Sequence, residues 1–181
     1  MSTDTFDYTI AYAVIFCVGG IIVVSLYSFL YSCPGPNALS RDETWGYIGR
    51  YGEGWKLAWK VFTLFTAAAV CTLFIWLSFV NENDDKNEHT ALAGTIVFML
   101  GAIVWPIGVL RGSMRLAQAG VLTAAVGSII LLVYVLVLAD EVPAWALIAA
   151  IWTAFHHCVI DGLWATLTPK GTALLVEKML Q

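Results

Sequence analysis

The sequence predicts an all-α integral membrane protein, a bundle of five transmembrane helices with the N-terminus outside and the C-terminus in the cytoplasm. Three observations predict this class. The composition is 60% hydrophobic and only 12% charged, with a mean hydropathy of +0.80. Five long apolar runs follow one another, and the Lys and Arg residues gather in alternate connecting segments. Such usage lies well outside that of soluble domains, so the chain is expected in a lipid bilayer.

The apolar runs have the length of membrane spans. A helix crosses the hydrocarbon core with roughly 20 mainly apolar residues. Runs of this kind cover residues 8–31, 57–80, 91–110, 116–139 and 144–167. Because lipid offers no hydrogen-bond partner to the backbone, and because the runs lack the strict alternation of a barrel, each is expected to be a helix. We therefore predict a single domain over residues 1–181, with residues 32–56 as its longest loop.

The orientation follows from the positive residues, which are retained on the cytoplasmic side. Eight of the nine Lys and Arg residues lie in or beside the first loop, the third loop and the C-terminal tail: Arg41, Arg50, Lys56, Lys60, Arg111, Arg115, Lys170 and Lys178. Only Lys86 lies on the other side, together with most of the acidic residues. The net charge of -4 and the absence of a basic patch in the sequence argue against a nucleic acid as partner.

Two connecting segments have a distinctive composition. In the cytoplasmic loop 32–56 and just beyond it, aromatic residues recur every four positions: Tyr47, Tyr51, Trp55 and Trp59. Glycines between them work against a stable helix, so we interpret these rings as an aromatic belt at the headgroup layer, with a docking surface as the alternative. The segment NENDDKNEHT, residues 81–90, is interpreted as a solvated acidic turn on the outside.

Small residues predict where helices approach each other closely. Gly120, Ala124 and Ser128 are spaced by four along the 116–139 span and form a ridge. Association in lipid depends on such close backbone approach. We expect Ala67–Ala69 of the second span or Gly19 and Gly20 of the first span to receive this ridge.

The stretch WTAFHHCVIDGLWAT, residues 152–166, places two histidines and an aspartate inside an apolar span. On a regular helix, Thr153, His157 and Asp161 are successive i, i+4 neighbours, whereas His156 projects about 100° away. The geometry predicts a hydrogen bond between His157 and Asp161 and excludes a chelate made by the adjacent histidines. Ionisable residues inside a span are candidates for function, here for binding a proton or a ligand.

Counting along the helices suggests which groups meet this face. At ~1.5 Å per residue, Lys60, Arg115 and Gln118 come close to the cytoplasmic boundary, as does Asp161. We therefore expect a polar vestibule open to the cytoplasm, with Asp161 paired to Lys60 or Arg115.

Cofactor chemistry has little support in the spans. A metal site needs three or four convergent ligands, and the predicted spans hold no further His, Asp or Glu, so no metal is predicted. Two histidines on different helices for a haem are also lacking, because His89 lies in the 81–90 segment. No cofactor is predicted, although a single axial bond from His156 or His157 to a haem or chlorophyll-like ring stays open.

Two functions from different classes fit these features. In the first, the chain is a non-catalytic subunit or assembly component of a membrane complex, with other membrane subunits or a second copy as partner. In the second, it is a small transporter, channel or ligand-binding bundle that uses the His157–Asp161 pair. We give precedence to the subunit, because the spans hold few polar groups and transporters usually have broken helices near the midplane.

An enzyme acting on a lipid or sterol-like substrate is the weaker alternative. The segment HCVIDG, residues 157–162, resembles the His and acidic-Gly element of the emopamil-binding sterol isomerase group. The sequence departs from that group in having Asp161 where Glu is expected, and it offers no matching second acid.

Overall fold

The structure, a computed structural model, describes residues 8–32, 35–39, 53–79 and 85–162. The described residues form helices and turns and no strand. The helices are α1 (Tyr8–Ser32), α3 (Glu53–Phe79), α4 (Asp85–Leu110), α5 (Met114–Val133) with its π-helical continuation η1 (Tyr134–Leu138), and α6 (Ala144–Phe155) with its π-helical continuation η2 (His156–Ile160).

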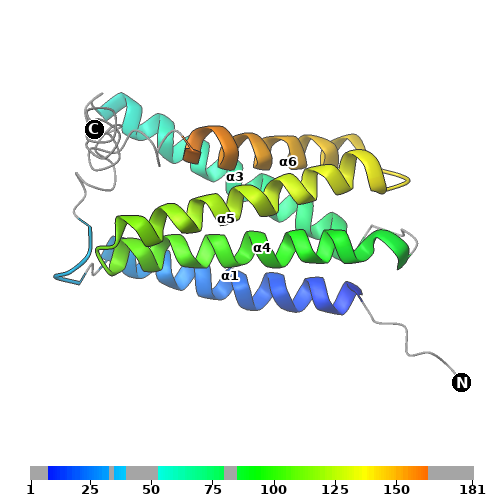
Figure 1. Ribbon diagram of the computed structural model, residues 1–181. Coiled ribbons are helices and arrows are strands. Elements are labelled where there is room, and N and C mark those ends of the chain that lie inside the picture. The colour runs from blue at the N-terminus through cyan, green and yellow to red at the C-terminus, as the bar shows by residue number, and fades with distance from the viewer. Residues whose placement is uncertain (1–7, 33–34, 40–52, 80–84, 163–181) are drawn as a thin grey trace, which may run out of the picture.

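These helices lie side by side as an elongated bundle in which α1, α3, α4, α5 and α6 alternate in direction (Figure 1). Four helical segments of the described chain are long and apolar enough to cross a membrane: Ile10–Leu30, Val61–Phe79, Asn87–Leu110 and Met114–Leu138. A shorter apolar helix covers Ala144–Ile160, and the predicted end of this span at residue 167 lies outside the described residues. The all-helical class and its membrane-like character are thus confirmed.

Glycines define the contact between α4 and α5. At four positions a methyl group in place of hydrogen would overlap the backbone of the facing helix: Gly101 against Ala124, Gly108 against Ala117, Gly120 against Trp105, and Gly127 against Phe98. Within each helix these glycines are seven residues apart, a spacing that keeps one side of a helix facing a neighbour at a small crossing angle. We call this contact the glycine seam. It brings the two backbones into direct contact, as small residues permit in membrane bundles.

The glycine seam corrects the predicted packing ridge. Gly120 and Ala124 pack against α4 instead of the first or second span. Ser128 faces another neighbour, since its Oγ lies 4.0 Å from Sγ of Cys158 in η2. Gly19 of α1 also faces α4, where an added methyl group would lie 3.1 Å from Sδ of Met99. The prediction was wrong because α4 and α5 are joined by a short turn, which makes them immediate antiparallel neighbours.

That turn is set by two residues. Gly112 has a φ of 68°, a backbone conformation that side chains other than hydrogen disfavour. Ser113 then caps α5, its Oγ accepting a hydrogen bond from the backbone N–H of Leu116 at 3.3 Å.

Two helices begin earlier than the sequence predicted. Residues 53–56 belong to α3 instead of the 32–56 loop, and residues 85–90 belong to α4 instead of a solvated turn. The earlier start of α4 places Glu88 inside the bundle, where only 5% of its surface is exposed. An acidic residue near a helix N-terminus is favoured by the helix dipole, which explains why the acidic run starts a helix.

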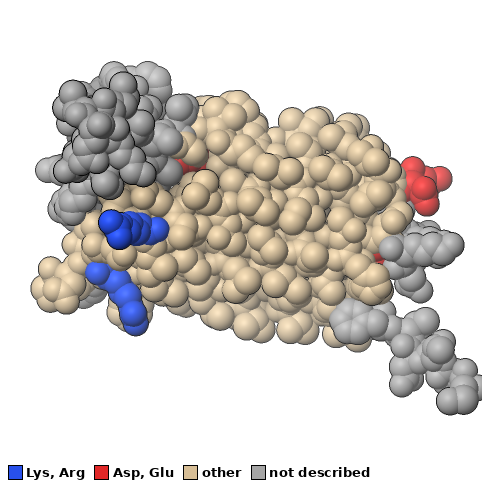
Figure 2. Space-filling model, viewed as in Figure 1, with Lys and Arg blue, Asp and Glu red and all other residues tan. Residues whose placement is uncertain are grey.

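In the view of Figure 2, the visible Lys and Arg side chains lie at one end of the bundle, and most of the visible Asp and Glu atoms lie at the other. The exposed residues Arg111 and Arg115 flank the α4–α5 turn at one end, and Asp140 and Glu141 lie exposed between η1 and α6 at the other. This separation follows the pattern on which the orientation was predicted. Which end faces the cytoplasm stays a prediction.

Candidate functional site

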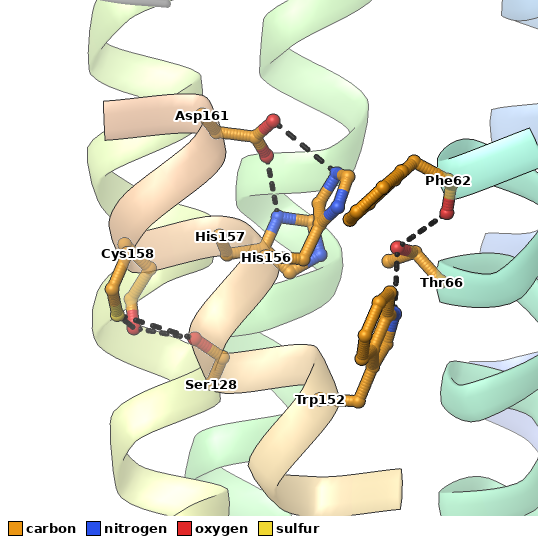
Figure 3. A network of polar contacts seen from close by, with 9 residues as sticks. Phe62, Thr66, Ser128, Trp152, His156, His157, Cys158 and Asp161 are labelled. Atoms are coloured by element: carbon orange, nitrogen blue, oxygen red, sulfur yellow. Dashed lines mark hydrogen bonds and ion pairs between the residues drawn. The ribbon is translucent and has the colours of Figure 1, made fainter. Parts of the chain in front are cut away.

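The centre of the candidate site is one carboxylate that holds two imidazoles (Figure 3). Oδ2 of Asp161 lies 2.7 Å from Nδ1 of His157, and its Oδ1 lies 3.4 Å from Nε2 of His156. The three side chains are largely enclosed, with exposed fractions of 7% for His156, 15% for His157 and 20% for Asp161. We call these three residues the His–His–Asp triad.

The π-helical turn η2 explains why both histidines reach the same carboxylate. The backbone N–H of Asp161 donates to the carbonyl of His156, five residues earlier, instead of to the residue four earlier. In such a turn the i+5 residue lies above residue i, while the i+4 residue remains close. The expected contact of His157 with Asp161 is therefore present, and the expected separation of His156 from it is wrong. The error came from assuming a regular α-helix.

The carboxylate also fixes the tautomers of the neutral rings. An ionised Asp only accepts hydrogen bonds, so His157 donates from Nδ1 and His156 donates from Nε2. Nε2 of His157 then carries a lone pair, and this buried atom has no hydrogen-bond partner within the described part of the chain. The ring of His157 is held edge-on by Phe98 of α4, with 5.0 Å between ring centroids. A buried lone pair of this kind can accept a proton or a hydrogen bond.

Other polar contacts fix α6 to its neighbours. Nε1 of Trp152 donates to Oγ1 of Thr66 in α3 at 3.1 Å, and Thr66 donates to the carbonyl of Phe62 at 3.0 Å. The indole also stacks on the ring of Phe62, with centroids 5.4 Å apart. Cys158 of η2 packs against α5, where its Sγ lies 3.9 Å from the carbonyl oxygen of Ala125. These contacts position the triad between α3, α4 and α5.

The remaining predicted site residues do not join the triad in the expected way. Thr153 is buried, but its hydroxyl donates to the carbonyl of Ala149 in its own helix. Arg115 is exposed at the start of α5, and the predicted pairing of Asp161 with it is wrong, because two neighbouring imidazoles already occupy the carboxylate. Gln118 is half-buried one turn further along α5. Lys60 belongs to α3, but its side chain lies outside the described part of the structure.

The aromatic belt falls largely beyond what the structure describes. Tyr47 and Tyr51 lie outside the described residues, and the side chains of Trp55 and Trp59 are not described either. Within residues 8–32, 35–39, 53–79 and 85–162, no group of three His, Cys, Asp or Glu side chains is placed to hold a metal ion. A haem or chlorophyll-like ring bound through His156 stays a prediction, and Nε2 of that residue faces Asp161.

A second polar cluster, at the opposite end of the bundle, was missed by the sequence reasoning. The hydroxyl of Tyr12 donates to Oε2 of buried Glu88 at 2.9 Å, and Oη of Tyr8 lies 2.7 Å from Nδ1 of His89. These contacts join the first turns of α1 and α4. The available signal was the pair of tyrosines one helical turn apart, opposite an acidic residue that begins an apolar run. No protein-family model, curated protein or solved structure matches this chain.

Proposed function

We propose that the chain is a multi-pass membrane protein that binds and releases a proton, or a small protonated ligand, at the His–His–Asp triad. The observation that carries this proposal is the buried Nε2 of His157, which has no partner within the described residues although Asp161 holds the same ring at Nδ1. A carboxylate on one nitrogen orients an imidazole and leaves the lone pair on its other nitrogen.

Charge arithmetic supports the same conclusion. An ionised Asp161 with two neutral rings gives the triad a charge of minus one, whereas one added proton brings the total to zero. A low-dielectric interior disfavours uncompensated charge, so the triad has a reason to take up a proton. Two imidazoles on one carboxylate offer two places for that proton.

A purely structural role has less support, because other residues provide the links that such a role needs. The contacts that hold Asp161 come from His156 and His157 of its own helical segment. Trp152 and Thr66, by contrast, join α6 to α3 directly. For this reason we place the proton or ligand site ahead of the non-catalytic subunit to which the sequence alone gave precedence.

The experiment that tests the proposal is a pH titration of the full-length protein in nanodiscs, with the histidine side chains labelled with ¹⁵N. We expect the signals of His156 and His157 to titrate together, because they share a carboxylate. His157→Gln should abolish the coupled transition and leave the helical circular dichroism unchanged.

The matched control is His89→Gln, which removes the third histidine of the chain from the opposite end of the bundle. This change should leave the coupled transition intact. If His157 stays in one protonation state from pH 4 to pH 9, and no amine or other protonated small molecule perturbs its signal, the proposal is wrong.

A second candidate function is that of a subunit in a larger membrane complex, and the position of α1 favours it. Only 6% of the most apolar stretch of α1 is buried inside the bundle. The corresponding stretches of α3, α4 and α5 are 33%, 44% and 39% buried. The outer face of α1 carries the exposed residues Ile10, Val14, Val18 and Ile21, which another transmembrane helix could cover in place of lipid. Extraction in mild detergent followed by light scattering distinguishes a monomer from a homo-oligomer or a hetero-complex. A monomeric particle would remove this candidate.

A further inference from the structure

One buried hydroxyl in the core lacks the hydrogen bond that three other helical threonines make. Thr66, Thr123 and Thr153 each donate to the backbone carbonyl four residues earlier. Thr95 of α4 is completely buried, and its Oγ1 has no hydrogen-bond partner within the described part of the molecule. Buried hydroxyls are nearly always satisfied, so this exception indicates a group, such as water, that the hydroxyl is placed to bind.

Thr95 lies between the two polar clusters. The buried face of α4 carries Glu88, Ala91, Thr95 and Phe98, at successive steps of three and four residues. At ~1.5 Å per residue, Thr95 is about 10 Å along the axis from Glu88 and about 5 Å from Phe98. Phe98 in turn contacts the ring of His157. One face of a single helix therefore leads from the buried carboxylate at one end to the triad near the other.

Glu88, the carboxylate at the start of this path, is buried and hydrogen-bonded. Glu88 is 5% exposed and accepts the hydrogen bond of Tyr12. The titratable groups around the Tyr12–Glu88 pair are Tyr8 of α1, His89 of α4 and Tyr134 of η1. His89 and its partner Tyr8 lie at the end of the bundle, beside Glu88, where solvent can reach them.

From this arrangement we propose that Glu88, Thr95 and His157 form a proton relay along the buried face of α4, with water bound at the Thr95 hydroxyl completing the path. The relay deepens the proposed function and rests on it, because His157 is its last member inside the bundle. It assigns to Glu88 a role at a second proton-binding site, and to Thr95 the role of a positioning residue for water.

The proton balance closes at each step. Protonated Glu88 gives its proton to water and becomes a carboxylate. Water held by Thr95 passes a proton to the lone pair on Nε2 of His157, which becomes an imidazolium. The imidazolium then releases the proton on Nδ1 to Asp161, which gives it to solvent. Rotation of the ring turns the remaining Nε2–H toward Asp161 and the lone pair on Nδ1 toward the water, so that the ring can accept the next proton. The gradient across the membrane sets the direction.

The test is proton flux into liposomes that contain the full chain, driven by a potassium diffusion potential and read from a trapped pH-sensitive dye. Thr95→Val keeps the shape of the side chain and removes its hydroxyl, so flux should fall by about tenfold or more. Thr95→Ser keeps the hydroxyl and should retain flux. Thr123→Val is the matched control, because Thr123 already donates to Ala119 and should not contribute.

The carboxylate is tested with a matched pair at the same end of the bundle. Glu88→Gln should abolish flux, whereas Glu141→Gln, which alters an exposed acid, should leave it unchanged. Wild-type flux in both Thr95→Val and Glu88→Gln would overturn the relay, and it would leave the proposed function standing if His157 still titrates. A His157 that does not titrate in the nanodisc experiment would overturn both.

Discussion

Gly101 of α4 and Ala124 of α5 lie in backbone contact, so that a methyl group on Gly101 would overlap the backbone nitrogen of Ala124. Gly101→Ala should therefore force the two helices apart. We expect a loss of about 1–3 kcal/mol in the free energy of unfolding, the range typical of overpacked interiors. Unfolding in mixed micelles, followed by circular dichroism, measures it.

The control for this change is Gly20→Ala in α1, where an added methyl group meets nothing within 4 Å. That variant should unfold like the wild type. Equal stability of the two variants would show that α4 and α5 are not in contact through the glycine seam.

The bond between Trp152 and Thr66 predicts a measurable coupling between α6 and α3. Trp152→Phe and Thr66→Val should each destabilise the protein, and the double variant should lose less than their sum, with a coupling energy of about 0.5–1.5 kcal/mol. A double-mutant cycle of unfolding free energies gives this value. Trp145→Phe, at a more exposed indole on the same helix, should show no coupling to Thr66→Val.

The shared carboxylate predicts that Asp161→Asn perturbs two histidines at once. The two rings contact different oxygens of Asp161, and in Asn one of these atoms is replaced by an amide nitrogen that only donates, so the ¹⁵N signals of both His156 and His157 should shift. Asp140→Asn, an exposed acid in the turn before α6, should shift neither. A response confined to His157 would mean that η2 is a regular α-helix in solution.

The predicted orientation is checked with single cysteines at the two charged ends. In a background with Cys17, Cys33, Cys71 and Cys158 replaced by Ser, a membrane-impermeant maleimide added to intact cells should label Glu141→Cys. It should label Arg111→Cys only after the cells are opened, because the positive end is expected in the cytoplasm. The reverse pattern would invert the orientation.

Much of the helical architecture follows from hydropathy, because the bilayer sets both the length and the hydrogen bonding of a span. The runs 91–110 and 116–139 overlap α4 and α5 with its continuation η1, although both helices begin earlier, at Asp85 and Met114. The errors lie where charged residues begin helices. Segment 85–90 resembled a loop because hydropathy counts Glu88 as polar, although Tyr12 of another helix satisfies its carboxylate.

The site was predictable only as far as a regular helix describes it. The spacing of His157 and Asp161 gave their contact, since four residues make about one turn. The second contact, to His156, depends on the π-helical turn η2. No local sequence pattern predicts such a turn. The glycine seam could not be predicted from the sequence either. Its glycines meet the facing backbone only because the turn at Gly112 makes α4 and α5 neighbours.

The glycine seam also divides the bundle into a stiff part and a part with more freedom. Side chains between two helices can change rotamer and let the helices slide, but backbone pressed on backbone leaves no such adjustment between α4 and α5. We therefore expect α4 and α5 to move together as one rigid unit. In the proposed relay, we thus expect a rearrangement beside Phe98 to come from α6 with its triad, and the Trp152–Thr66 bond couples such a motion to α3.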